Sequence, residues 1–176
     1  AHYPMEFMAA LLTCEMDNND KVLRHINECR EMGIEITPPD INESKRDFTI
    51  AQEKIRFGLA AVKNVGAAAI ESILHSRSEG GPFSSLLNFC KRIDLRKVNR
   101  RVIESLIKCG AFDSTAASRS QMMAVLDTAI ERAQQHQKEL TSKQTSMFAL
   151  FSDTLSKDTD EPFPDLPEWS EEELLT

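Results

Sequence analysis

The residues best suited to binding chemistry form a tight turn, Lys63-Asn64-Val65-Gly66-Ala67, with apolar residues on both sides. Those flanking residues predict two short helices. The turn and the start of the second helix present backbone N–H groups without an intrahelical partner, and phosphate oxygens accept such groups. Gly66 permits close approach, Val65 anchors the turn in the core, and Lys63 adds charge. The segment therefore predicts a phosphate site; an ordinary turn between core helices is the alternative.

The segment Leu59–Leu74 resembles a helix-hairpin-helix motif, in which a glycine–hydrophobic–glycine turn joins two short helices. Asn64 stands in place of the first glycine. Asn is the non-glycine residue that best tolerates a left-handed backbone, so the departure is compatible with the motif. Contacts from such a turn reach the phosphate backbone rather than the bases. We therefore expect sequence-independent, salt-sensitive DNA binding.

A second basic unit follows. Two acids, Asp94 and Glu104, stand against seven bases: Lys91, Arg92, Arg96, Lys97, Arg100, Arg101 and Lys108. A helix over Asn99–Lys108 would turn its aliphatic residues inward and its bases outward. Paired hairpins commonly straddle a duplex, so Arg96, Lys97, Arg100 and Arg101 are predicted to bind the DNA backbone. A basic face that binds an acidic protein is the alternative.

Composition sets broad limits on the function. The chain has 176 residues, a net charge of −7, 41% hydrophobic and 6% aromatic residues, which indicates one domain with an aliphatic core and a tail. No apolar run is long enough to cross a bilayer, so we expect a soluble cytoplasmic protein without a membrane partner. The four cysteines are dispersed, which predicts reduced thiols and no zinc site.

Charge is also segregated along the chain, because acids dominate between Asp153 and Glu173. The Ser, Thr, Asp, Glu and Pro residues after Thr141 bury too little apolar area to offset ordering, which predicts a mobile tail. The predicted fold is mainly α, with a small β-hairpin, tandem helix-hairpin-helix units and a disordered acidic C-terminal tail.

The remaining elements follow from periodicity. A first helix has Phe7, Met8, Leu11 and Leu12 at helical spacing, and a second runs from about Asp20 to a stop at Gly33. A short extended segment at Ile34–Ile36 precedes two short strands, which Ala51-Gln52-Glu53 joins. Helices are then expected at Ser85–Arg92 and from Arg119 to Leu140.

Several stretches resemble the alpha subunit of bacterial DNA polymerase III, a replicative polymerase of the C family. They are Glu6–Thr13, Asn27–Gly33, Pro39–Ser44, Ile55–Gly66 and Leu106–Asp113. The resemblance implies four parts: the end of the helical fingers domain (1–45), the helix-hairpin-helix region (46–115), a connecting helix (116–140) and a flexible tail (141–176). Because the chain starts in apolar sequence, it is expected to be part of a larger protein.

The tail contains Gln144-Thr-Ser-Met-Phe148, which resembles the internal clamp-binding pentapeptide of this family. Met147 and Phe148 would enter an apolar pocket, Gln144 would form a directional hydrogen bond, and Ser146 is the small residue between them. The implied partners are duplex DNA at the primer-template, a sliding clamp, the remaining polymerase domains and other holoenzyme subunits. A chance apolar pair in a linker is the alternative.

The chain itself is predicted to be non-catalytic and to hold no metal or other cofactor. Two-metal catalysis requires clustered carboxylates, and the one candidate, Pro39-Asp40-Ile41-Asn42, has a single acid that suits a turn. The resemblance implies that the parent is a Mg²⁺-dependent DNA-directed DNA polymerase. A hairpin-containing DNA glycosylase is a rival, but no suitably placed Asp follows the hairpin. A stand-alone DNA- or protein-binding hairpin module is the other alternative.

Overall fold

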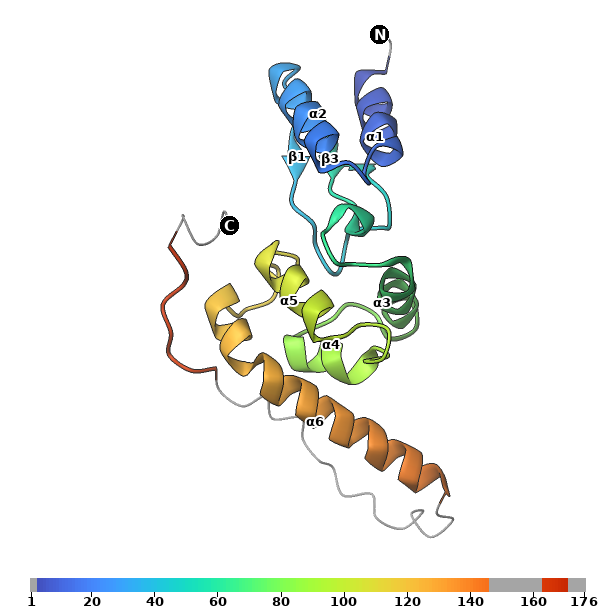
Figure 1. Ribbon diagram of the computed structural model, residues 1–176, viewed down its shortest axis with the longest axis vertical. Helices are drawn as coiled ribbons and strands as arrows, with labels where there is room; N and C mark the ends of the chain where they lie inside the picture. Colours follow the sequence, from blue (N-terminus) through green and yellow to red (C-terminus); the bar gives the residue numbers. More distant parts are fainter. Residues whose placement is uncertain (1–2, 146–162, 171–176) are drawn as a thin grey trace.

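The computed structural model describes residues 3–145 and 163–170, with side chains up to residue 142 in the first range. The fold is mainly α with a small sheet (Figure 1), which confirms the predicted fold class. In chain order, the elements are α1 (Pro4–Cys14), α2 (Asn19–Glu31), β1 (Ile36–Thr37), β2 (Thr49–Ala51), β3 (Lys54–Arg56), the 3₁₀ turn η1 (Leu59–Ala61), α3 (Ala67–Gly80), α4 (Leu86–Arg92), α5 (Arg100–Lys108) and α6 (Arg119–Thr145).

Helices α1 and α2 lie side by side and form one end of the molecule (Figure 1). The side chain of Asn18 caps α2 by accepting a hydrogen bond from the Lys21 amide, and Gly33 follows the helix at φ +73°. The predicted apolar stripe of α1 is corrected at one position. Phe7 is 60% exposed, because Met8, Ala9 and Leu12 form the buried face instead.

The predicted β-hairpin is present, with Ile50 opposite Ile55 and a turn in which Gln52 and Glu53 have positive φ. The sheet has a third strand, β1, where the sequence predicts only a short extended segment. Strand β1 pairs in parallel with β3, so the order is β1-β3-β2. Such a two-residue strand has too little sequence for its pairing to be predicted, since the partner lies elsewhere in the chain.

Two hydrophobic clusters stabilise the fold. The first joins α1, α2 and the sheet, and the second joins η1 with α3, α4, α5 and α6. Phe57, just after β3, packs against both clusters and contacts Phe48 in the first, with ring centroids 4.8 Å apart. In the second, Phe89 packs edge-on against Phe83 and Phe112, and this aromatic centre supports both hairpin units.

Helix α6 packs against α4 and α5 through Met122, Leu126, Ala129 and Ala133. It ends at Thr145, five residues beyond the expected end at Leu140, so apolar periodicity underestimated its length. No helix in the described ranges is both long and apolar enough to cross a membrane.

Within the acidic tail, residues 163–170 lie against the core and the start of α6. Phe163 packs against the second cluster, and Glu168 accepts hydrogen bonds from the amides of Arg119 and Ser120 at 3.0 and 3.2 Å. Partial burial raises the pKa of Glu168, but the Trp169, Arg119 and Ser120 amides outweigh it, so the net pKa is lowered. Glu168 therefore caps α6 from 48 or more residues away, a contact too distant in sequence to be predicted.

The cysteines are all free thiols. Burial raises the pKa of Cys90 to about 12 and that of Cys109 to about 11, so both remain protonated at neutral pH. Cys29 is also buried, whereas Cys14 is exposed. Cys109 is partly buried and packs against the second cluster.

The buried His25 links α2 to the end of α1. Its Nε2 lies 2.8 Å from Glu15 and its Nδ1 lies 2.9 Å from Glu28. Hydrogen bonds that the imidazole donates to the carboxylates of Glu28 and then Glu15 raise the pKa of His25, and they outweigh desolvation. Lys21 and His25 lower the pKa of Glu15, and His25 lowers that of Glu28 despite partial burial. The cluster therefore favours an imidazolium between two carboxylates.

This cluster predicts a pH dependence of stability. The pKa of His25 is raised above 6.5 in the folded protein. Its contribution to folding stability is therefore complete below pH 6.5 and is lost as the pH rises through the pKa of the folded state. The two carboxylates, with pKa lowered from 4.5, contribute above that value and lose their contribution as pH falls. We expect the wild-type Tm to decrease in thermal melts as pH rises above 6.5, with a smaller decrease in His25→Gln.

The matched control is His75→Gln. The His75 side chain is 72% exposed and pairs only with Glu79 among the described residues, so this variant should keep the wild-type pH profile. If Tm depended on pH in the same way in the wild type and in His25→Gln, the His25 cluster would contribute no pH-dependent stability.

Candidate nucleic-acid interface

The first hairpin consists of η1, the turn Val62–Gly66 and α3, as the sequence predicts. Asn64 has φ +68°, so it does adopt the left-handed conformation expected of a residue that replaces glycine. Val62 and Val65 are each 7% exposed and fix the turn to the core. Gly58 precedes the unit, where a Cβ would lie 2.5 Å from the backbone of Asp47, so this approach requires glycine.

The start of α3 has no side-chain cap, because its N-cap residue is Gly66. Among the described residues, the amides of Gly66, Ala67 and Ala68 donate no hydrogen bond, whereas the Ala69 and Ile70 amides bond to the Gly66 carbonyl. A Cβ at Gly66 would meet nothing within 4 Å. The predicted phosphate site is therefore open, with three amides available and Lys63 exposed beside them.

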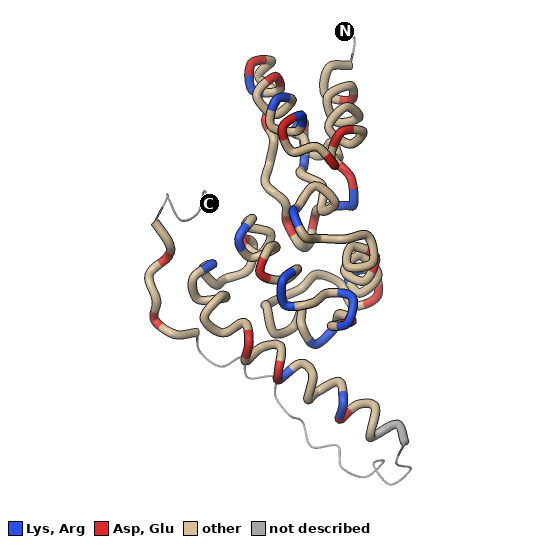
Figure 2. Tube along the Cα trace, in the orientation of Figure 1, with Lys and Arg blue, Asp and Glu red and all other residues tan. Residues whose placement is uncertain are grey.

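The second hairpin consists of α4, the turn Ile93–Asn99 and α5. Asp94 organises the turn, since its carbonyl accepts from the Lys97 and Val98 amides and its carboxylate accepts from the Arg96 amide. Asn99 caps α5 by accepting from the Val102 amide at 3.1 Å, as predicted. Lys and Arg residues gather along this turn and the start of α5 (Figure 2).

The two hairpins are in direct contact. The side-chain amide of Asn64 donates to the Ser105 hydroxyl on α5 at 3.0 Å. Between them is a groove of about 810 Å³ whose lining includes Lys63, Asn64, Arg101 and Lys108. The structure therefore places the first-hairpin residues Lys63 and Asn64 beside Arg100 and Arg101 of the second unit.

The basic face is less positive than the sequence indicates. Arg100 pairs with Asp127 of α6 at 2.6 Å and with Glu104 at 2.9 Å, and Arg96 pairs with Asp94 at 3.2 Å. Hydrogen bonds from Arg96 lower the pKa of Asp94, so it stays ionised. Asp127 could not be predicted as a partner because it is 27 residues from Arg100.

Arg92 is a structural residue rather than part of a binding face. Its guanidinium donates to the carbonyls of Ser76, Gly81 and Pro82 and lies 4.4 Å from the centre of the Phe83 ring. It thereby joins the end of α3 to α4. The exposed cations of the interface that have no ion pair with a described residue are Lys63, Lys97 and Arg101.

Asp40 occupies a turn, as the sequence analysis expected. Its carboxylate accepts from the Asn42 and Glu43 amides at 2.7 and 3.1 Å. Within residues 3–145 and 163–170, no three His, Cys, Asp or Glu side chains form a group that could hold a metal ion. In the predicted clamp-binding segment, Gln144 belongs to the last turn of α6. Ser146, Met147 and Phe148 lie outside the described residues.

The paired hairpins on an aliphatic core define a helix-hairpin-helix protein, and comparison of the sequence with known proteins gives the same result. The chain belongs to the helix-hairpin-helix motif family, whose model matches residues 33–122. It is similar over 99% of its length to DNA polymerase III subunit alpha: 43% identical to that of Vibrio cholerae, 44% to that of Neisseria meningitidis serogroup B and 39% to that of Escherichia coli K12. The predicted resemblance to this subunit is thereby confirmed. The chain spans about 15% of the length of these relatives.

Proposed function

We propose that this chain binds duplex DNA through the sugar–phosphate backbone, independently of base sequence, as a non-catalytic part of a replicative DNA polymerase. One observation carries the proposal: the uncapped start of α3, with three available amides beside Lys63, is joined through Asn64 and Ser105 to the basic start of α5. The names of the relatives, each a DNA polymerase III subunit alpha, support the polymerase context.

Each hairpin would contact one strand. At the first, the amides of Gly66, Ala67 and Ala68 would donate to a phosphate while Lys63 supplies the charge. At the second, Lys97 and Arg101 would contribute side-chain charge, because Asn99 already caps the start of α5. Arg96 and Arg100 would have to exchange carboxylate partners for phosphate. Such contacts position a protein on DNA without reading its sequence.

The second part of the proposal is that Gln144, Ser146, Met147 and Phe148 bind a sliding clamp. An apolar pair preceded by a hydrogen-bonding side chain suits a peptide-binding pocket on a partner protein. The segment begins in the last turn of α6, which packs on the hairpin units, so a clamp bound there would be tethered to the DNA-binding surface. Nucleotidyl transfer and its Mg²⁺ ions would belong to other parts of the parent polymerase.

A paired titration tests both parts. Against duplex DNA at low salt, Lys63→Glu should weaken binding about tenfold or more by replacing attraction with repulsion at the phosphate, and should bind the clamp normally. Against a bacterial sliding clamp, the double variant Met147→Ala/Phe148→Ala should lose binding while keeping its affinity for DNA. Fluorescence anisotropy with labelled duplex and calorimetry with the clamp provide the two readouts.

The opposite results would decide against the proposal. Duplex binding that is unaffected by Lys63→Glu would remove the first hairpin from the interface. Clamp binding that persists in the double variant would reduce Gln144–Phe148 to a linker. Failure of the wild-type chain to bind DNA at low salt would favour the alternative in which the basic face binds an acidic protein.

A further inference from the structure

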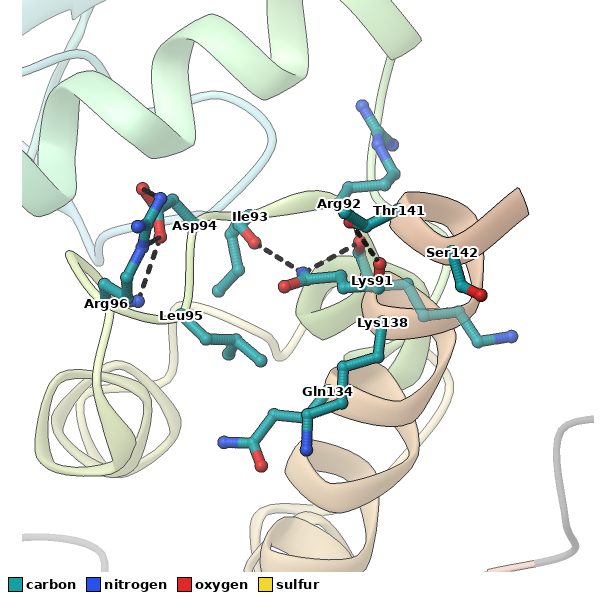
Figure 3. Close-up of a pocket in the computed structure, with 11 residues that line it drawn as sticks. Lys91, Arg92, Ile93, Asp94, Leu95, Arg96, Gln134, Lys138, Thr141 and Ser142 are labelled. Atoms are coloured by element: carbon teal, nitrogen blue, oxygen red, sulfur yellow. Dashed lines mark hydrogen bonds and ion pairs between the residues drawn. The ribbon is translucent and has the colours of Figure 1, made fainter. Parts of the chain in front are cut away.

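A second polar groove lies between the turn of the second hairpin and the C-terminal half of α6 (Figure 3). It is a hollow of about 940 Å³, separate from the groove between the hairpins. The turn supplies Asp94, Leu95 and Arg96 on one side, and α6 supplies Gln134, Lys138 and Thr141 on the other. Lys91 and Ser142 also line the groove.

The lining is rich in hydrogen-bond donors and poor in acids. Lys91, Arg96 and Lys138 provide positive charge, and the α6 residues add amide and hydroxyl groups. Asp94, the one carboxylate among the described lining residues, is already bound by the Arg96 guanidinium, with Nε 3.2 Å from Oδ1. None of the described lining residues is aromatic, so they offer no stacking surface for a base. Lys, Arg, Gln, Ser and Thr are the side chains that contact nucleic-acid phosphates and sugars.

The two walls are held together by Gln137. Its side-chain amide lies 2.9 Å from the carbonyl of Ile93, 3.2 Å from that of Lys91 and 3.4 Å from that of Cys90. These carbonyls belong to the end of α4 and the residue after it, so Gln137 satisfies acceptors that the helix leaves free. The groove is therefore a fixed feature, in which Lys138 stands next to the residue that attaches α6 to the hairpin.

The groove also adjoins the proposed DNA surface through the turn of the second hairpin. Asp94–Arg96 forms its wall, and Lys97 and Arg101 follow directly in the same turn and at the start of α5. We propose that this groove is an additional binding site for the DNA backbone, which extends the duplex contact from the second hairpin along α6. This inference rests on the proposed function, since it requires that the hairpins bind DNA. It assigns α6 a direct role in binding beyond that of a connecting helix.

The test is the salt dependence of duplex binding by Lys138→Gln, measured by anisotropy with the full chain. Loss of one phosphate contact should reduce the log–log slope by about 0.9 and weaken binding roughly five- to tenfold near 0.1 M salt. Lys138 is exposed, so the substitution should leave the thermal unfolding curve unchanged. The control is Lys54→Gln on β3, which removes the same charge, together with its ion pair to Glu35, at a residue that does not line the groove, and it should keep the wild-type slope.

The outcomes separate this inference from the proposed function. If Lys138→Gln kept the wild-type salt slope while Lys63→Glu bound DNA more weakly, the groove would not be a DNA-binding site, but the hairpin contact would stand. A poly-glutamate peptide that binds wild type but not Lys138→Gln, with DNA binding unchanged in that variant, would assign the groove to an acidic protein instead. No binding of DNA by wild type would overturn the proposed function and the groove with it.

Discussion

Replacing Gly66 with Asp is expected to stabilise the fold and to eliminate most of the duplex binding. Gly66 is the N-cap of α3 with φ −80° and ψ 165°, an extended conformation that any residue adopts, and its missing Cβ would meet nothing. An Asp side chain there can accept a hydrogen bond from the amide of Ala68 or Ala69. Relative to glycine at an N-cap, the expected gain is a few tenths of a kcal/mol, measurable by urea unfolding.

The same substitution should block the DNA contact. Its carboxylate would occupy the place of the phosphate at the Gly66–Ala68 amides and would repel the DNA strand, so we expect at least a roughly tenfold loss of affinity. Gly66→Asn is the matched control, because it can form the same cap without the charge and should lose less affinity. Wild-type DNA affinity in a folded Gly66→Asp variant would show that the start of α3 does not contact phosphate.

Truncating Phe89 to Ala should cause the largest loss of stability. Phe89 is fully buried, and its ring lies 4.9 Å from that of Phe83 and 5.1 Å from that of Phe112. Removing a buried Phe leaves a cavity and costs about 3–5 kcal/mol in the free energy of unfolding. Because α4, α5 and α6 share this cluster, the hairpins should also lose their fixed positions, which denaturant unfolding and DNA titration would both detect.

Phe7→Ala provides the comparison, since it removes the same side chain from an exposed position on α1. Its 60% exposure predicts a change within about ±0.5 kcal/mol. A loss below about 1 kcal/mol for Phe89→Ala would mean that the three rings contribute little to the core.

Local features of the hairpins could be predicted from sequence because short-range sterics and periodicity determine them. Asn64 was expected in a left-handed conformation and has φ +68°, and Asn99 was expected to cap α5 and does so. The inward residues Val102, Ile103, Leu106 and Ile107 of that helix are all buried. Each of these outcomes depends on a few neighbouring residues and on one helical face.

The partners of the charged residues could not be predicted in the same way. Arg92 was counted with the exposed bases, yet it donates to carbonyls at the end of α3, and Arg100 pairs with Asp127 of α6. Similarly, Glu168 caps α6 from the acidic tail. These contacts join residues that lie 11 to 49 positions apart, so they exist only once the helices have packed. A count of charges along the sequence therefore overestimates the positive surface.

Binding of the DNA backbone by the paired hairpins, independently of base sequence, can be tested in one salt titration. The affinity of the wild-type chain would be measured for two duplexes of equal length and unrelated sequence across a range of salt concentrations. We expect equal affinities and a log–log slope of about −2 to −4, from roughly two to four neutralised phosphates. No binding at low salt, or a marked preference for one sequence with a slope near zero, would contradict it.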